Sequence, residues 1–263
     1  INIEQDDKVK AFICTQDLKD EDYTNSHYVI MATKKGQVKK TSLEQYSRPR
    51  TNGINAITIK EDDELLEAKL TTGESQVMLA LKSGKAIRFE EAKTRPMGRG
   101  ASGVRGITLA HEADEVIGMI AVDDMESNIL VVSENGYGKR SSLEDYRITN
   151  RGGKGVKTIS ITDKTGNLVS IKNVTDEDDL MIINKSGVAI RLAVEDLRVM
   201  GRATQGVRLI NLKGNDSIAA VAKVMREDEE DIEAIEALSE DGVENSTAPQ
   251  PDAGTINDTQ EEE

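Results

Sequence analysis

Tryptophan is absent from the 263-residue sequence, which contains only two Phe, five Tyr and one Cys. A core must therefore be aliphatic, and the single Cys14 excludes a disulfide within the chain, which suits a reducing cytoplasm. His27 and His111 are too few for a typical zinc site. No apolar run approaches the roughly 20 residues that span a bilayer, and no charged-then-apolar leader opens the chain. We expect a cytoplasmic protein and, because the sequence begins with Ile1, a piece of a longer chain.

Basic residues are missing from residues 227–263, which carry fifteen of the 48 acidic residues. The rest of the chain holds all 34 Lys and Arg against 33 acidic residues, so the net charge of −14 belongs almost entirely to the C-terminal segment. This acidic composition with Pro, Asn and Thr predicts a disordered tail over 227–263. The near-neutral remainder is compatible with a polyanionic partner.

Two series of glycines repeat at about fifty residues. A first glycine ends each of four apolar runs, at Gly36, Gly84, Gly136 and Gly187. A second glycine opens the segments "GINAITI", "GVRGITL", "GVKTISI" and "GVRLINL", at Gly53, Gly103, Gly155 and Gly206. Two independent landmarks with one period indicate a repeat architecture.

Each repeat unit is predicted to contain four short strands: one before the first glycine, one after it, one after the second glycine, and one after a polar turn. The opening "INIEQDDKVKAFICT" matches the second half of a unit. Residues 1–226 thus divide into units near 1–27, 28–75, 76–127, 128–178 and 179–226, or about four and a half repeats. Four strands per fifty residues predict an all-β fold of propeller-like blades, which bury their faces by stacking on neighbours.

Lys and Arg recur at matching places in these units. Four places after the first glycine stand Lys40, Arg88, Arg140 and Arg191. Eight places before the second glycine stand Arg95, Arg147 and Arg198; four places before it stand Arg99, Arg151 and Arg202, with Arg48 in the shorter first loop. Two places after it stand Arg105, Lys157 and Arg208. Adjacent to these positions are Lys39, Arg50, Lys139 and Lys154.

This basic ladder predicts that one edge of every blade is positive. A curved row of such edges matches a bent phosphate backbone and reads no base sequence. Aromatic residues are lacking at these places, which argues against single-strand binding by base stacking. The loop "RGGKG", residues 151–155, adds Gly152, Gly153 and Gly155, whose amides can approach a phosphate oxygen because no Cβ obstructs them.

Other chemical patterns are weaker. The G-x-G-x-x-G match at 98–103 lies in a β repeat with no following helix, so it does not predict a dinucleotide site. Paired carboxylates such as Asp62–Asp63 and Asp123–Asp124 fall at blade turns, where hairpin chemistry explains them. A propeller scaffold that binds proteins in place of DNA remains an alternative, which an apolar rim would favour.

The motifs "VRGITLAHEADEVIGMI", "NGYGKRSSLEDY" and "RPMGRGASGVRGI" closely resemble the C-terminal domain of bacterial DNA gyrase A, one of the two kinds of gyrase subunit. The resemblance covers about residues 1–225. It implies a β-pinwheel of blades whose rim wraps duplex DNA, so that ATP-dependent strand passage introduces negative supercoils. The family's Q-R-R-G-G-K-G box is matched at 151–155, with Thr149 and Asn150 in place of its first two residues. The homologous subunit of topoisomerase IV is the nearest alternative.

The resemblance also implies where the chemistry lies. The cleavage tyrosine of such enzymes follows an arginine, and none of the five tyrosines here is preceded by Arg. The resemblance therefore implies no catalytic residue, metal site or cofactor in this chain. ATP and Mg²⁺ are expected on the partner, gyrase B, in an A2B2 holoenzyme that contains a second copy of gyrase A.

Overall fold

A computed structural model of the chain describes residues 8–226. The predicted acidic tail at 227–263 and the first seven residues lie outside the described part. Backbone contacts separate Ile1–Met225 from Arg226–Glu263, and the description below concerns the first of these units.

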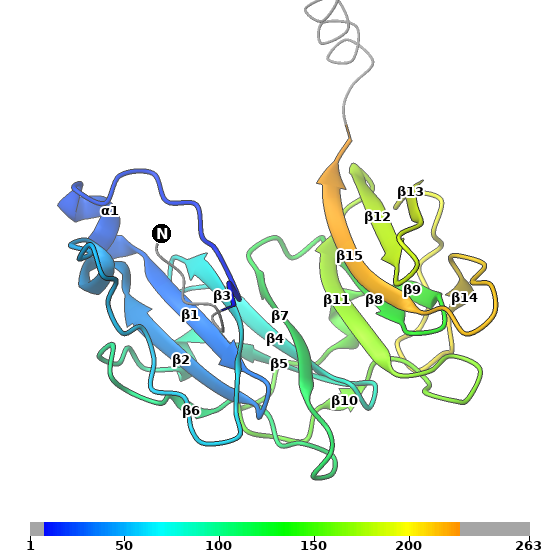
Figure 1. Cartoon of the computed structure of the whole chain (residues 1–263), viewed down its shortest axis with the longest axis horizontal. Coiled ribbons are helices and arrows are strands. Elements are labelled where there is room, and N and C mark those ends of the chain that lie inside the picture. Colours follow the sequence, from blue (N-terminus) through cyan, green and yellow to red (C-terminus); the bar gives the residue numbers. More distant parts are fainter. Residues whose placement is uncertain (1–7, 227–263) are drawn as a thin grey trace, which may run out of the picture. The chain divides into compact units, whose positions relative to one another are not determined.

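The described residues form antiparallel sheets (Figure 1). Sheet A contains, in spatial order, β3 (Leu65–Thr71), β1 (Tyr28–Thr33), β2 (Gln37–Ser42) and β6 (Val104–Arg105). Sheet B contains β10 (Val156–Lys157), β5 (Lys85–Glu90), β4 (Gln76–Leu81) and β7 (Val116–Val122). Sheet C contains β11 (Leu168–Val174), β8 (Asn128–Ser133), β9 (Tyr137–Ser142) and β14 (Val207–Arg208). Sheet D contains β13 (Ala189–Ala193), β12 (Asp178–Asn184) and β15 (Ile218–Met225).

Helices are short in this part of the chain. They are α1 (Glu21–Ser26) and the 3-10 turns η1 (Leu43–Tyr46), η2 (Glu91–Lys93) and η3 (Leu143–Asp145). Between residues 8 and 226, no helix has the length and apolar character needed to cross a membrane. The predicted all-β fold with four-stranded blades is confirmed.

The short strands β6, β10 and β14 are exchanged between units. Val104 pairs with Val38, Val156 with Ala86, and Val207 with Gly138, each in the preceding unit. The expectation that one unit supplies all four strands of its blade is therefore wrong, because each complete sheet takes three strands from its own unit and the fourth from the next. Gly103, Gly155 and Gly206, which precede these strands, have positive φ and lie against carbonyls of the preceding unit.

The same exchange explains two departures at the ends of the array. Residues 53–59 match the exchanged strands in sequence but form no strand, because no preceding unit offers them a partner among the described residues. Sheet D has three strands in the described part of the chain, where residues up to 226 include no following unit that could supply a fourth. The strand expected within "VKAFICT" is also absent from residues 9–15. Its counterparts β3, β7, β11 and β15 pair with the first strand of their own unit, and the opening half-unit includes no such strand.

The core lies between successive sheets. Val77, Leu79 and Leu81 of β4 pack toward sheet A with Ile30 and Val38. The alternate residues of β4, Met78 and Ala80, pack toward sheet C with Ile129 and Val131. Leu130 and Val132 of β8 then pack toward sheet D with Leu180 and Ile182. A strand buried on both faces needs apolar residues at every position, which is why these strands are continuous apolar runs in the sequence.

Candidate nucleic-acid interface

The loop between the second strand and the exchanged strand is fixed against the preceding blade. Its backbone forms parallel bridges that join Pro96 to Lys40, Ile148 to Arg88, and Val199 to Arg140. One residue later, the amides of Met97, Thr149 and Met200 donate to the carbonyls of those same three basic residues at 2.8, 2.9 and 2.8 Å. The loops of three successive units are thus held in equivalent positions.

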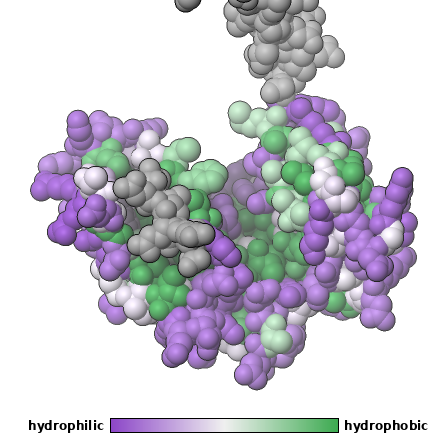
Figure 2. Space-filling view, in the orientation of Figure 1, coloured by the Kyte–Doolittle hydropathy of each residue, from purple (hydrophilic) through white to green (hydrophobic). Residues whose placement is uncertain are grey.

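Ten of the candidate cations are exposed. They are Arg48, Arg50, Arg95, Arg105, Arg147, Lys154, Lys157, Arg191, Arg198 and Arg208. All but Arg191 lie in these loops, in the exchanged strands or in the corresponding first loop. In the view of Figure 1, β6 and β10 lie along the lower edge, and Figure 2 shows mostly hydrophilic side chains there. These exposed groups are the part of the basic ladder that is open to solvent.

Gly153, Lys154 and Gly155 of the "RGGKG" loop line a pocket of about 250 Å³ together with Arg147. Two of its glycines, Gly152 and Gly155, let the loop backbone lie close to the preceding unit. The Gly152 amide donates to the Gly106 carbonyl at 2.6 Å, and a Cβ on Gly155 would lie 2.6 Å from the Ala86 carbonyl oxygen. The Gly152 amide is therefore already used within the protein, which corrects the expectation that it is available to a phosphate.

Five of the candidate cations are buried: Lys39, Lys40, Arg88, Lys139 and Arg140. Arg88 donates to the carbonyls of Leu143 and Tyr146 at 2.7 and 3.0 Å, at the η3 turn of the next unit. Lys40 lies 3.6 Å from the Glu91 carboxylate at η2, and Arg140 donates to the Leu197 carbonyl and to Asp176. These residues hold adjacent blades together. We therefore remove all five from the proposed interface.

Lys39 and Lys139 are buried beneath the loops, and their ammonium groups donate hydrogen bonds to loop carbonyls. The Lys39 ammonium donates to the Ala56 carbonyl at 2.5 Å and to the Arg99 carbonyl, and Lys139 donates to the Gly201 carbonyl at 2.6 Å. Burial, followed by the nearby positive charge of Arg99, lowers the pKa of Lys39 to about 8. Burial likewise lowers the pKa of Lys139 to about 8, with Asp145 opposing this shift and Arg202 adding to it.

Arg99, Arg151 and Arg202 are half-buried and reach back to the preceding unit. Arg151 donates to the carbonyls of Lys93 and Arg105, both at 3.1 Å. Arg202 donates to the Lys157 carbonyl at 2.8 Å. The Arg151 guanidinium therefore also ties its loop to the neighbouring blade.

Two exposed arginines have partners of their own. Arg191 lies on the open edge of sheet D and pairs with Asp179 at 2.6 Å. Arg208 donates to the Tyr137 hydroxyl at 2.8 Å, beside Lys164, whose ammonium lies 5.3 Å from the Tyr137 ring centre. The hydrogen bond from Arg208 is the main cause of a lowered Tyr137 pKa. Lys164 was missed in the sequence because it stands in a turn outside the repeated positions.

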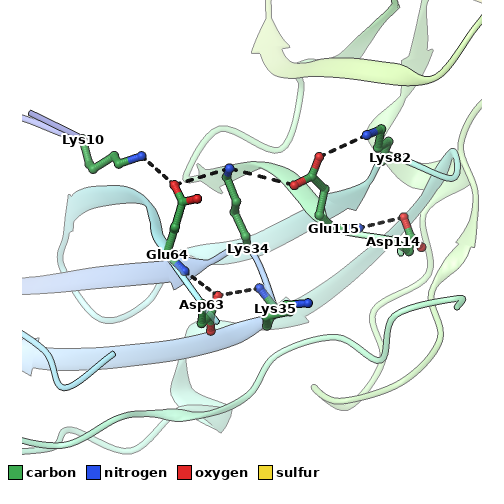
Figure 3. Close-up of polar contacts among 8 residues, drawn as sticks. All are labelled: Lys10, Lys34, Lys35, Asp63, Glu64, Lys82, Asp114 and Glu115. Atoms are coloured by element: carbon green, nitrogen blue, oxygen red, sulfur yellow. Dashed lines mark hydrogen bonds and ion pairs between the residues drawn. The ribbon is translucent and has the colours of Figure 1, made fainter. Parts of the chain in front are cut away.

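The acidic residues at blade turns also have structural partners. Asp114 accepts hydrogen bonds from the Ser83 amide and hydroxyl at 3.1 and 2.7 Å, and Asp63 accepts one from the Lys35 amide at 2.8 Å. Figure 3 shows an ion-pair chain beside them that links three units, in the order Lys10, Glu64, Lys34, Glu115 and Lys82. The pKa of Glu64 is lowered, first by the hydrogen bond and the positive charge of Lys10 and then by those of Lys34. Within residues 8–226, no cluster of His, Cys, Asp and Glu has the arrangement of a metal site.

Comparison with known proteins places this geometry in a family. The family described as "DNA gyrase C-terminal domain, beta-propeller" matches residues 27–72, 77–123, 127–175 and 178–225. The DNA gyrase A protein of Staphylococcus aureus strain MRSA252 is 46% identical over 246 residues, covering 93% of this chain and 27% of the relative. The gyrase A protein of strain NCTC 8325 is 46% identical over 249 residues, covering 93% of this chain and 28% of the relative.

Solved structures agree with this assignment. A DNA gyrase A C-terminal domain superposes with a TM-score of 0.75 at 25% identity, covering 86% of this chain and 73% of that one. The C-terminal domain of a DNA topoisomerase IV superposes with a TM-score of 0.73 at 24% identity, covering 82% and 67%, and shows the same fold. The chain spans just over a quarter of the length of the gyrase A proteins that it matches, and it belongs to the family of DNA gyrase A C-terminal β-propeller domains.

Proposed function

We propose that this chain binds duplex DNA and bends it along the edge formed by its loops. The observation that carries this proposal is the placement of exposed arginines at the same fixed loop position in three successive units: Arg95, Arg147 and Arg198. Evenly repeated cations on a rigid edge neutralise phosphates at intervals, which favours a curved path for the duplex.

The proposed contact is with the DNA backbone and carries little base preference. Residues 95–105, 147–157 and 198–208 contain no aromatic side chain on which unpaired bases could stack. No helix or extended ribbon projects from these loops in the described chain to read the major groove. Exposed arginines on a short loop suit phosphate and sugar contacts.

In the whole protein, we propose that this domain wraps DNA for a type IIA topoisomerase. Gyrase B and a second copy of gyrase A would complete the A2B2 enzyme, with ATP and Mg²⁺ bound on gyrase B, in the bacterial cytoplasm at the nucleoid. The relatives' greater length leaves room for the cleavage machinery outside this chain. The role of this domain would then be to present a bent segment whose passage introduces negative supercoils.

The test is a salt titration with a charge-matched control. The variant replaces Arg95, Arg147 and Arg198 with Ala; the control replaces Lys19, Lys60 and Lys213, which are exposed outside the loops. Affinity for a mixed-sequence duplex is measured between 50 and 200 mM salt. We expect the loop variant to flatten the slope of log K against log salt by about 2.7, or roughly 0.9 for each lost phosphate contact. Equal losses in the two variants would contradict the assignment of the loops.

Bending is measured separately. When a nicked circular duplex is closed by ligase with the domain bound, wrapped DNA leaves a changed linking number after the protein is removed. The wild-type chain should produce this change, and the loop variant should produce less of it. Binding without any change in linking number would leave a DNA-binding domain that does not wrap.

A further inference from the structure

Each loop arginine is followed by an apolar side chain that faces solvent. The dipeptides are Arg48–Pro49, Arg95–Pro96, Arg147–Ile148 and Arg198–Val199, with the arginines 47, 52 and 51 residues apart. Ile148 is 47% exposed and Val199 is 51% exposed, and both prolines are exposed. An exposed apolar residue at one surface position is ordinary, whereas the same position in four successive units indicates a common contact.

These side chains are presented on a rigid tip. We use this term for the three dipeptides at 95–96, 147–148 and 198–199. The residue before each tip is held by a 3-10 turn or its equivalent, through the Thr94, Tyr146 and Leu197 amides, which donate at 2.8, 3.1 and 2.9 Å. The residue after each tip donates to the preceding blade as described above. A tip fixed on both sides loses little conformational entropy on binding.

The side chains that flank the tips are buried or half-buried, whereas the tip residues themselves are exposed. Thr94 and Tyr146, just before two of the tips, and Met97, just after one, are all buried. Ile148 and Val199 belong to none of the apolar clusters formed by the described residues. The core therefore does not use these two side chains, and a partner outside the domain can cover them.

We infer that the tips enter the minor groove of the bound duplex, where the apolar side chain packs on deoxyribose while the arginine lies between the phosphate strands. This inference rests on the proposed DNA-binding function. A two-residue tip is too small to fill the major groove, which is about 12 Å wide, but it fits the minor groove at about 6 Å. The minor groove narrows and gains negative potential where DNA bends toward a protein, which attracts arginine. Histones wrap DNA with arginine side chains inserted each time the minor groove faces the protein, which is the arrangement inferred for these tips.

The apolar contact predicts a part of the affinity that salt does not remove. Burial of hydrocarbon against sugar releases no counterions, so it changes the level of log K without changing its slope against log salt. The loop arginines, in contrast, determine the slope. The two contributions from one tip can therefore be separated in one experiment.

The experiment compares two double variants of matched chemistry. The tip variant is Ile148→Thr with Val199→Thr, and the control is Ile59→Thr with Val188→Thr, whose side chains are 41% and 53% exposed outside the tips. Binding to a mixed-sequence duplex is measured over a salt series, together with thermal unfolding. We expect the tip variant to bind roughly tenfold more weakly at every salt concentration, with an unchanged slope and a smaller linking-number change. The control should match the wild-type chain.

The possible failures are distinguishable. If the wild-type chain does not bind duplex DNA with a salt-dependent affinity, the proposed function fails and this inference fails with it. If the wild-type chain binds and the tip variant matches the control, or loses affinity only through a smaller slope, the inference fails and the proposed function stands. Hydroxyl-radical footprinting of the wild-type complex needs no variant. Protection of sugars facing each other across the minor groove is expected, and protection confined to the major-groove side would overturn the inference.

Discussion

Burial separates cations that look alike in the sequence. Arg88 and Arg95 are seven residues apart and both belong to the repeated basic positions. Arg88 is 8% exposed and its guanidinium donates to carbonyls of the next unit, whereas Arg95 is exposed at a loop tip. One serves the contact between blades and the other is available to a ligand.

The first prediction follows from this difference. Replacing Arg88 with Met leaves the Leu143 and Tyr146 carbonyls without their donor, so we expect a loss of about 2–3 kcal/mol in the free energy of unfolding. Replacing Arg95 with Ala should change this free energy by no more than about 0.5 kcal/mol. Denaturant unfolding of both variants provides the measurement. Similar stabilities for the two would contradict the structural role of Arg88.

The second prediction concerns the pH dependence of stability. The pKa of Lys139 is about 8 in the folded chain, below the ordinary value of 10.5. Between these values the unfolded chain binds more protons at this site, so the contribution of Lys139 to stability rises as pH increases from about 8 to about 10.5. The Lys139→Ile variant should lose this dependence. Isoleucine is chosen because Ile87 stands at the matching position of the preceding unit. The unfolding free energy of the wild type minus that of the variant should be larger at pH 10 than at pH 7. An equal difference at the two pH values would contradict the prediction.

At the scale of the element, the exchanged strands make each blade depend on the next unit. Gly103, Gly155 and Gly206 allow this exchange, since a Cβ at these positions would lie 2.5–2.6 Å from a carbonyl oxygen of the preceding unit. Gly53 occupies the same place in the first unit, also with positive φ, but nothing lies within 4 Å of its Cβ position. Gly53 is therefore a control for Gly155: both have positive φ, but only Gly155 lies close to a carbonyl of the preceding unit.

The third prediction uses this pair. Gly53→Val should cost on the order of 1–3 kcal/mol, the strain of a side chain at positive φ. Gly155→Val should cost more, because the Ala86 carbonyl must also move and the β5–β10 pairing is disturbed. Thermal unfolding of the two variants is compared with the parent. A Gly155→Val variant as stable as Gly53→Val would show that the close approach has no energetic consequence.

At the scale of the whole molecule, the charges are segregated along the chain. The cations of the loops belong to residues 1–226, and the fifteen carboxylates of 227–263 have no basic residue among them. Because a polyanion tethered to the same chain would compete with DNA for these cations, we expect residues 227–263 to weaken DNA binding.

The fourth prediction tests this competition. A chain that ends at Arg226 should bind duplex DNA more tightly than the full chain, and the gain should be largest at low salt, where screening is weakest. The measurement is affinity over a salt series for both chains. Identical affinities at every ionic strength would assign residues 227–263 no role in DNA access.

The sequence alone determined the repeat, the three long strands of each unit from residue 28 onward and the loops that carry the arginines. These features depend on local signals: continuous apolar runs predict strands buried on both faces, and the spaced glycines mark turns. Only the tertiary structure decided that β6, β10 and β14 pair with the preceding unit, because a two-residue strand has no pattern that selects its partner. It also decided which cations are exposed. Arg88 and Arg147 occupy equally regular positions in the sequence, and only the packing of one blade on the next buries the first and leaves the second in solvent.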